Sequence, residues 1–130
     1  MLSDRAGSDS DDSALGGEVK VTSEQLDKLF AEIEKRRRAA PDSSYSAQLL
    51  ADLPRATRKL GEEAVETIIA ALQQDDAALT AEAADLLYHL LVVLAARNIA
   101  LGDVMQVLAE RQGVSGLAEK AARAQQGDND

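Results

Sequence analysis

The 130-residue chain contains no cysteine and no tryptophan, and only 2% of its residues are aromatic. Without cysteine, the chain has no disulfides, no thiolate zinc sites and no thiol nucleophiles. A core with so few aromatic residues must be built from Leu, Ile, Val and Ala, a composition that favours helices. Only two prolines occur, so long uninterrupted segments are allowed. The length fits one ordinary domain.

Positive charge is also scarce, because 14 Lys and Arg residues face 23 Asp and Glu residues and leave a net charge of −9. A nucleic-acid backbone would repel such a chain, although a phosphorylated small molecule can still bind through a cation. No run approaches the roughly 20 apolar residues of a membrane span, and the N-terminus lacks the apolar core of a signal peptide. We therefore expect a soluble cytoplasmic protein with neither a nucleic-acid nor a membrane partner.

Composition and apolar spacing divide the chain into three parts. Residues 1–21 are rich in Ser, Asp and Gly without apolar periodicity, which predicts a disordered acidic tail. Residues 22–112 carry apolar side chains at helical spacing and form the predicted domain. Residues 113–130 predict a weak Ala-rich helix, about Leu117 to Gln125, and a tail. The helices expected in the domain cover about 22–38, 46–52, 54–73, 77–97 and 102–112.

Local signals mark several helix ends. The basic run at 35–38 suits the C-terminal end of the first helix, where the macrodipole favours cations, although a binding patch is the alternative. Pro54 fits the first turn of a helix. Asp75 and Asp76 mark the turn and the cap before the longest helix, and Asn98 ends that helix.

No strand-like alternation appears, so we expect an all-α bundle of antiparallel helices. The longest helix is apolar on more than one side, which a small bundle does not cover alone. We therefore expect homodimerisation, or a higher homo-oligomer, to complete the bundle. The predicted stripe of the preceding helix consists of Leu60, Ala64, Val65, Ile68, Ile69 and Leu72, and the last domain helix should bury Val104, Val107 and Leu108.

Two pairs of carboxylates lie among these apolar residues. Glu63 and Glu66 are three residues apart on one helix, as are Glu82 and Asp85 on the next, so each pair shares a face. The connection between the helices is long enough for them to lie antiparallel with both pairs facing. Like charges in a partly dry site are costly, and a divalent cation with oxygen ligands relieves that cost. The pattern thus predicts a Mg²⁺ site. Solvated carboxylates on a helical face are the alternative.

Other polar residues surround the two pairs. Glu62 adds a carboxylate beside Glu63. His89, the only histidine, lies one turn after Asp85 and is interpreted as a buried His bonded to a carbonyl or carboxylate, as a partner that orients Asp85, or as a phosphate contact. Arg58 and Lys59 precede the first pair, where they either pair with its acids or bind phosphates.

Three segments closely resemble phosphoribosyl-ATP pyrophosphohydrolases: SSYSAQLL at 43–50, RKLGEEAVETIIAA at 58–71 and EAADLLYHLLVVLAARNIALGDV at 82–104. That family belongs to the all-α nucleoside-triphosphate pyrophosphatase superfamily, together with MazG-type enzymes. The resemblance covers about residues 26–111. It implies Mg²⁺-dependent hydrolysis of phosphoribosyl-ATP, between its α and β phosphates, to phosphoribosyl-AMP and pyrophosphate. This reaction is the second step of histidine biosynthesis.

The resemblance also implies roles for individual residues. Metal ligands fall on Glu63, Glu66, Glu82 and Asp85, catalytic carboxylates on Glu62 and Glu63, and substrate-binding residues on Lys59, Arg58, Tyr45 and His89. Two alternatives remain open. One is a MazG-type house-cleaning pyrophosphatase with the same metal site and another base pocket. The other is a non-catalytic helical dimerisation module.

Overall fold

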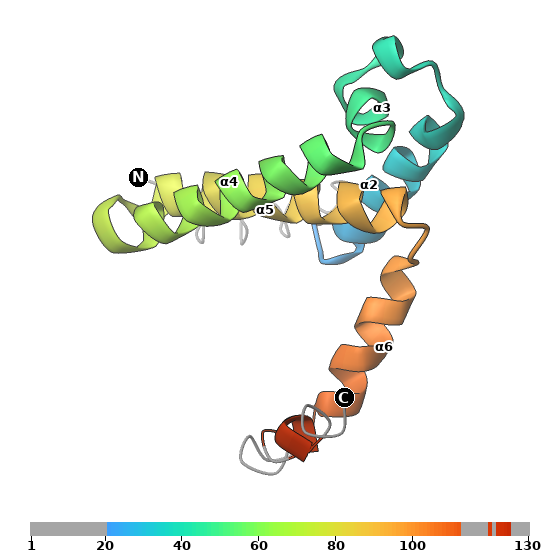
Figure 1. Cartoon of the computed structure of the whole chain (residues 1–130). Helices are drawn as coiled ribbons and strands as arrows, with labels where there is room; N and C mark the ends of the chain where they lie inside the picture. Colours follow the sequence, from blue (N-terminus) through green and yellow to red (C-terminus); the bar gives the residue numbers. More distant parts are fainter. Residues whose placement is uncertain (1–20, 113–119, 121, 126–130) are drawn as a thin grey trace, which may run out of the picture. The chain divides into compact units, whose positions relative to one another are not determined.

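The computed structural model describes residues 21–112, Lys120 and residues 122–125 (Figure 1). Every regular element in these ranges is helical, which confirms the predicted all-α class. The predicted tail lies outside the described residues except for Val21. Of the predicted C-terminal helix, Lys120 and residues 122–125 are helical, and the rest lies outside them. The elements are α2 (Glu24–Lys35), η2 (Arg36–Arg38), η3 (Pro41–Ser43), α3 (Tyr45–Leu50), α4 (Leu53–Gln73), α5 (Asp76–Ala96) and α6 (Leu101–Arg111).

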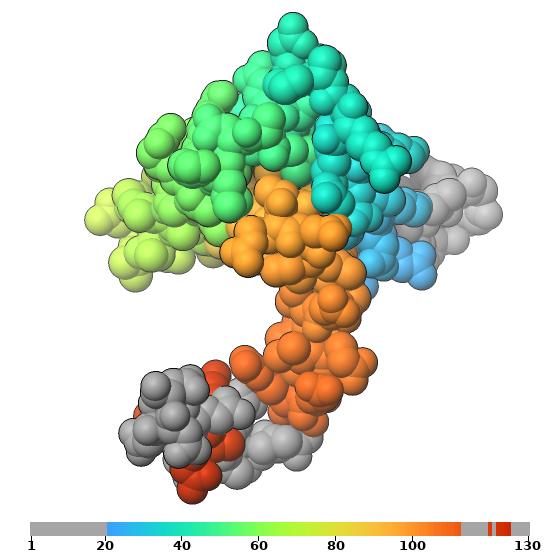
Figure 2. Space-filling view, turned by 45° about the vertical axis from the view of Figure 1, so that its right-hand side comes forward, coloured from blue at the N-terminus to red at the C-terminus, as the bar shows by residue number. Residues whose placement is uncertain are grey.

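The chain divides into two compact units, Met1–Ile99 and Ala100–Asp130. In the first unit, α4 and α5 lie antiparallel and side by side, and they share the most extensive contact in the chain (Figure 1). Helix α2 packs on α5, and the short α3 packs on both α4 and α5. In Figure 2, residues 36–50 (teal) and the start of α4 (green) form a continuous surface. The described part of the second unit consists of α6 and the short helical segment after it.

Side-chain caps explain where α4 and α5 begin. The Asp52 carboxylate accepts a hydrogen bond from the backbone N–H of Arg55 (3.1 Å), so α4 starts one residue earlier than predicted, with Pro54 still in its first turn. The Asp75 carboxylate accepts from the N–H of Ala78 (2.9 Å) in the same way. Each cap satisfies a backbone donor that has no partner inside the helix.

The C-terminal end of α5 follows the prediction that Asn98 ends the helix. Asn98 has φ of 58°, the left-handed conformation that Asn tolerates better than most residues. Its N–H donates to the carbonyl of Ala95 (3.0 Å), and the N–H of Ile99 donates to the carbonyl of Leu94 (2.8 Å). This pair of bonds is a Schellman motif, which satisfies two carbonyls at the helix end.

The best-buried apolar residues gather where α2, α3 and the C-terminal half of α5 meet. Leu49 and Val92 are 0% exposed, and Ile33 and Leu91 are 2% exposed. On α4, the buried residues are the small Ala56 and Ala70 and the acid Glu63. Small side chains let α5 approach α4 closely on the face that carries Glu63.

The outer face of α4 carries most of the predicted apolar stripe. Val65, Ile68, Ile69 and Leu72 are between 41% and 78% exposed, so most of the predicted stripe points away from the rest of the first unit. We call these four residues the outer stripe. It forms because α5 packs against the face of α4 that carries Ala56, Glu63 and Ala70. In α6, Val107 and Leu108 are likewise exposed rather than buried, and Leu101 is the buried residue.

Helix α5 is long and apolar enough to cross a membrane, by length and composition alone. Only 17% of its most apolar stretch is buried in the described chain. No continuous apolar run of that length exists, because Glu82 and Asp85 interrupt it. Helix α5 therefore presents more apolar surface than α2, α3 and α4 cover.

Candidate active site

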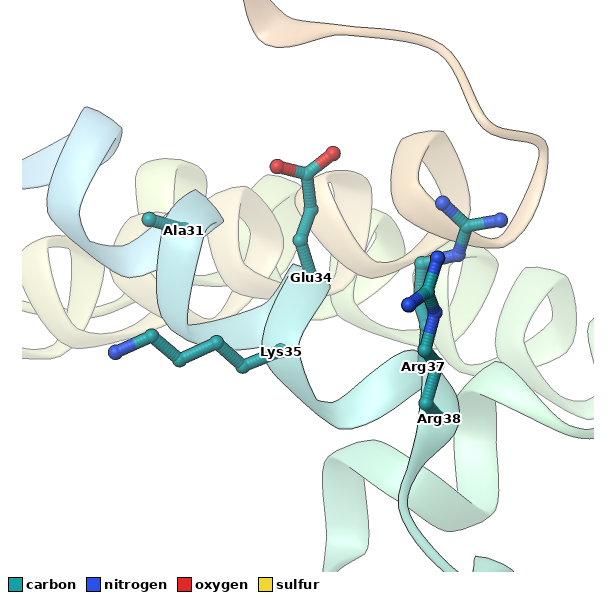
Figure 3. Close-up of a pocket in the computed structure, with 5 residues that line it drawn as sticks. All are labelled: Ala31, Glu34, Lys35, Arg37 and Arg38. Atoms are coloured by element: carbon teal, nitrogen blue, oxygen red, sulfur yellow. The ribbon is translucent and has the colours of Figure 1, made fainter.

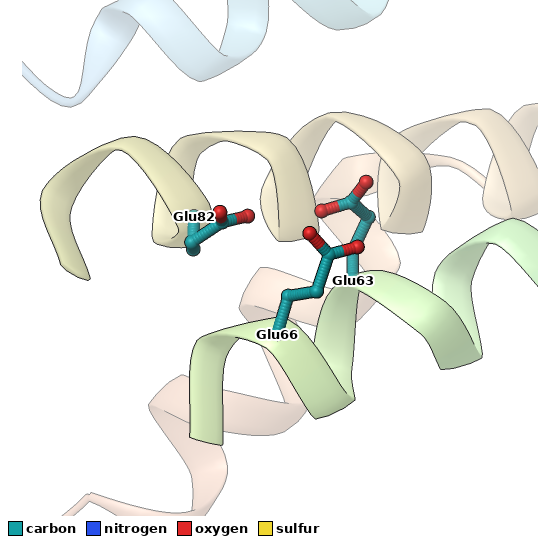
Figure 4. Close-up of side chains that lie close together, drawn as sticks. All are labelled: Glu63, Glu66 and Glu82. Carbon is teal, nitrogen blue, oxygen red and sulfur yellow. The ribbon is translucent and has the colours of Figure 1, made fainter. Parts of the chain in front are cut away.

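Three glutamates converge between α4 and α5 (Figure 4). Helix α4 supplies Glu63 and Glu66, and α5 supplies Glu82 from the antiparallel neighbour. One carboxylate oxygen from each lies within 4.8 Å of the other two. Glu63 is buried, Glu82 is half-buried and Glu66 is exposed, so the group runs from the helix interface to the surface. We call it the glutamate triad. It contains three of the four predicted metal ligands.

Two carboxylate oxygens of the triad are buried without a donor from the described residues. Among the described residues, no donor reaches the buried oxygens Oε2 of Glu63 and Oε1 of Glu82. Burial raises the pKa of Glu82, and the charge of Glu66, a hydrogen bond with Glu63 and the charges of Glu63 and Asp85 raise it further. Buried polar atoms without partners are uncommon and costly in native proteins. A hard divalent cation that takes carboxylate oxygens fits this donor set.

The Thr67 hydroxyl connects the two helices beside the triad. Its oxygen lies 2.8 Å from the carbonyl oxygen of Glu63 and 3.3 Å from that of Glu82, so it can donate to either. The two carbonyls belong to triad residues on different helices. Thr67 therefore fixes the register of α4 against α5 at the triad. This role of Thr67 was not predicted from the sequence, in which the one signal is a Thr one turn after Glu63.

Asp85, the fourth predicted ligand, stands apart from the triad. It is exposed one turn beyond Glu82 on α5, and its oxygens are not among those that converge. Its charge is close enough to contribute to the raised pKa of Glu82. The backbone carbonyl of Asp85, rather than its carboxylate, lies 2.8 Å from Nδ1 of His89.

Glu62 and Lys59 form an ion pair on the open side of α4, with 3.1 Å between Nζ and Oε1. The hydrogen bond and charge of Glu62 raise the pKa of Lys59. Glu62 and Glu66 line an open hollow of about 500 Å³ together with Gly61 and Val65. Arg58 is exposed on the same helix and makes no hydrogen bond or ion pair within the described ranges. The triad thus borders a hollow large enough for part of a ligand.

His89 is 6% exposed, and both of its ring nitrogens have partners. Because the Asp85 carbonyl only accepts, Nδ1 carries the proton. Nε2 lies 3.1 Å from the Tyr45 hydroxyl, with which it shares a hydrogen bond. The Tyr45 ring stacks on Tyr88, with 6.2 Å between centroids, and the Tyr88 and Ser46 hydroxyls share a hydrogen bond. His89 thus ties the first turn of α3 to α5, as a buried His bonded to a carbonyl.

Three cations of the basic run, Lys35, Arg37 and Arg38, line a separate hollow of about 480 Å³ at the end of α2, together with Ala31 and Glu34 (Figure 3). Arg37 donates from Nη1 to Oδ1 of Asn98 (2.9 Å), which ties this end of α2 to the end of α5. None of the triad residues lines this hollow. Helix α2 ends at Lys35, three residues before the predicted end, and the three arginines that follow form the short helix η2.

Comparison with known proteins agrees with this architecture. The family model for phosphoribosyl-ATP pyrophosphohydrolase matches residues 26–112. A phosphoribosyl-ATP pyrophosphatase of Ruegeria pomeroyi is 58% identical over 99 residues, which are 75% of this chain and 94% of that protein. Proteins of the same name from Caulobacter sp. and Cereibacter sphaeroides are each 57% identical, over 77% and 75% of this chain and 94% and 96% of their own lengths. The chain belongs to the phosphoribosyl-ATP pyrophosphohydrolase family.

Proposed function

We propose that this chain hydrolyses phosphoribosyl-ATP to phosphoribosyl-AMP and pyrophosphate, the second step of histidine biosynthesis. Membership of the family and the names of relatives at 57–58% identity support this reaction. The observation that carries the proposal is the pair of buried, partnerless oxygens on Glu63 and Glu82, which face each other across α4 and α5. Such a pair suits an enzyme that binds a polyphosphate through a cation.

Mg²⁺ is the cofactor that we propose for the triad. Glu63, Glu66 and Glu82 would hold it, and Asp85 would join them from the next turn of α5. When bound, Mg²⁺ neutralises the charge of phosphate oxygens and of the leaving pyrophosphate. This proposal also explains how a chain with net charge −9 accepts a polyanion.

The remaining residues orient the substrate and the water. Lys59 and Arg58, near the start of α4, would bind phosphate oxygens that the triad does not reach. Glu62 and Glu63 would hold the attacking water and accept its proton. The water oxygen bonds to one phosphorus of the α–β anhydride, the bond from that phosphorus to the bridging oxygen breaks, and pyrophosphate leaves. No side chain needs to form a covalent intermediate.

A second copy of the chain is the partner that we propose for the exposed apolar surface. The outer stripe of α4 is exposed and only 17% of the most apolar stretch of α5 is buried, and contiguous exposed apolar surface marks interaction sites. Lipid is a poor partner for α5, since Glu82 and Asp85 would then enter the bilayer. A homodimer would bury the outer stripe without contact with lipid. We therefore propose a cytoplasmic location.

Pyrophosphate release from phosphoribosyl-ATP, with ATP and dCTP in parallel, tests the proposed reaction. We expect release from phosphoribosyl-ATP in Mg²⁺ and none in EDTA. Release mainly from ATP or dCTP would indicate a MazG-type house-cleaning enzyme with the same metal site. No release from any substrate would indicate a non-catalytic helical module.

A further inference from the structure

Arg55 on α4 is a cation that the described residues leave without a carboxylate partner. Its Nη1 lies 3.4 Å from Oε1 of Gln48, a neutral amide, and its guanidinium carbon lies 6.0 Å from the centroid of the Tyr45 ring. The Asp52 carboxylate accepts the backbone N–H of Arg55 and makes no ion pair with the guanidinium. The side chain is therefore oriented by neutral groups while its charge stays available for an anion.

The position of Arg55 on α4 relates it to the triad. Lys59 and Glu66 follow by four and eleven residues, so all three share one helical face. Arg55 precedes Glu63 by eight residues, which is about 12 Å along the axis at about 1.5 Å per residue. A ligand with its triphosphate at the triad would meet Arg55 with a different part of the molecule.

Tyr45 holds the position of this guanidinium. Its hydroxyl is hydrogen-bonded to the buried His89, and its ring stacks on Tyr88. Tyr45 is nevertheless 41% exposed and Arg55 is half-buried, so the Arg55–Tyr45 pair lies at the surface. Arg55 thus has a fixed neighbour on one side and access to a ligand from solvent.

We infer that Arg55 binds a second phosphate group of the substrate, remote from the triphosphate. The inference rests on the proposed function, because phosphoribosyl-ATP carries a triphosphate on one ribose and a single phosphate on the other. ATP has no such second phosphate. A guanidinium fork that binds the single phosphate distinguishes the two nucleotides. Arg55 is then a specificity-determining residue, and Tyr45 is the residue that positions it.

Calorimetric titration of the full chain in Mg²⁺ with phosphoribosyl-AMP and with AMP tests the inference, because only the former carries the second phosphate. We expect the wild type to bind phosphoribosyl-AMP more tightly. Arg55→Gln should weaken that binding by about tenfold to a hundredfold, the range for a charge-assisted hydrogen bond, and should leave AMP binding unchanged. Lys28→Gln is the control, since Lys28 is exposed on α2, a helix that supplies no residue of the triad or of the Arg55–Tyr45 pair. It should change neither affinity.

Arg55→Lys keeps the charge and loses the fork, so it should reduce the preference for phosphoribosyl-AMP by less than Arg55→Gln. If Arg55→Gln does not fold, the preference of Arg55→Lys for phosphoribosyl-AMP over AMP tests the inference instead. An unchanged preference in the folded variants, or a wild type without the preference, would overturn the inference and leave Arg55 as a tie between α3 and α4. A wild type that shows the preference through Arg55 without hydrolysing phosphoribosyl-ATP would contradict the proposed function and support the phosphate site.

Discussion

Glu63 and Glu82 face one another across the interface of α4 and α5, and each has a buried carboxylate oxygen that no donor of the described chain reaches. The small residues Ala56 and Ala70 on the same face of α4 bring the helices together around this pair. A fold that places two carboxylates in such a position without donors is stabilised by a ligand that supplies positive charge.

Mg²⁺ should stabilise the chain through the triad. A ligand that binds only the folded state adds about 2.7 kcal/mol at a concentration one hundredfold above its Kd. We expect the melting temperature of the wild type to rise with Mg²⁺, and that of Glu63→Gln to respond much less. Glu32→Gln is the control, because Glu32 pairs only with Lys35 at the surface. An equal rise in all three proteins would indicate a general salt effect.

The raised pKa of Glu82 predicts a pH dependence of the metal-free protein. The folded chain keeps the proton of the Glu82 carboxyl at pH values where the unfolded chain has lost it. The contribution of this group to the stability of the folded state is therefore fully present below the unfolded pKa of about 4.3. It is lost as the pH rises through the higher folded pKa. In EDTA, Glu82→Gln should therefore be more stable than the wild type at neutral pH, and the difference should shrink toward pH 4. Urea unfolding of both proteins between neutral pH and pH 4 measures this difference in the free energy of unfolding.

Mg²⁺ provides the control for this prediction. Saturating Mg²⁺ should stabilise the wild type at neutral pH and leave Glu82→Gln nearly unchanged. A variant that is less stable than the wild type in EDTA at neutral pH would show that the Glu82 carboxylate has a stabilising partner.

Thr67 should act on the triad through the register of the helices. Thr67→Val keeps the shape and removes the hydroxyl that lies between the carbonyls of Glu63 and Glu82. We expect the Mg²⁺ affinity to fall by roughly tenfold, as for other residues that orient metal ligands. Thr67→Ser retains the hydroxyl and should bind as the wild type does. Calorimetric titration with Mg²⁺ distinguishes them, and equal affinities would remove Thr67 from the site.

The sequence predicted most helices because their signals are local. Pro54, Asp75 and Asn98 mark ends that need only neighbouring residues to form, and each lies where a helix begins or ends. The three-residue spacing of Glu63 and Glu66 is equally local. The sequence is therefore sufficient to predict the helices and to predict which residues of the triad each helix carries.

The packed face of α4 was not predictable from periodicity. The apolar stripe identified the most hydrophobic face of α4, whereas α5 packs on the face with Ala56, Glu63 and Ala70. Periodicity ranks faces by hydrophobicity, but the close approach of two helices depends on small side chains as well. Periodicity also does not predict contacts between helices that are distant in sequence, because these contacts depend on how the helices pack. Examples are the contacts of Thr67 with Glu82 and of Arg55 with Tyr45.

The outer stripe should hold two copies together. Ile68 is 58% exposed in a single chain, so a charge there costs a monomer little. We expect Ile68→Glu to dissociate the dimer in analytical ultracentrifugation and to lower the melting temperature. Ala71→Glu is the control, because Ala71 is exposed on α4 outside the outer stripe. A wild type that sediments as a monomer would contradict the proposed homodimer.

The most direct measurement is pyrophosphate release from phosphoribosyl-ATP at saturating Mg²⁺ by the wild type, Glu66→Gln, Asp85→Asn and the control Glu32→Gln. We predict that the wild type and Glu32→Gln turn over alike, and that Glu66→Gln and Asp85→Asn lose nearly all activity while still folded. Near-wild-type turnover by Glu66→Gln would contradict the triad as the catalytic metal centre. The same result for Asp85→Asn would remove Asp85 from the ligands.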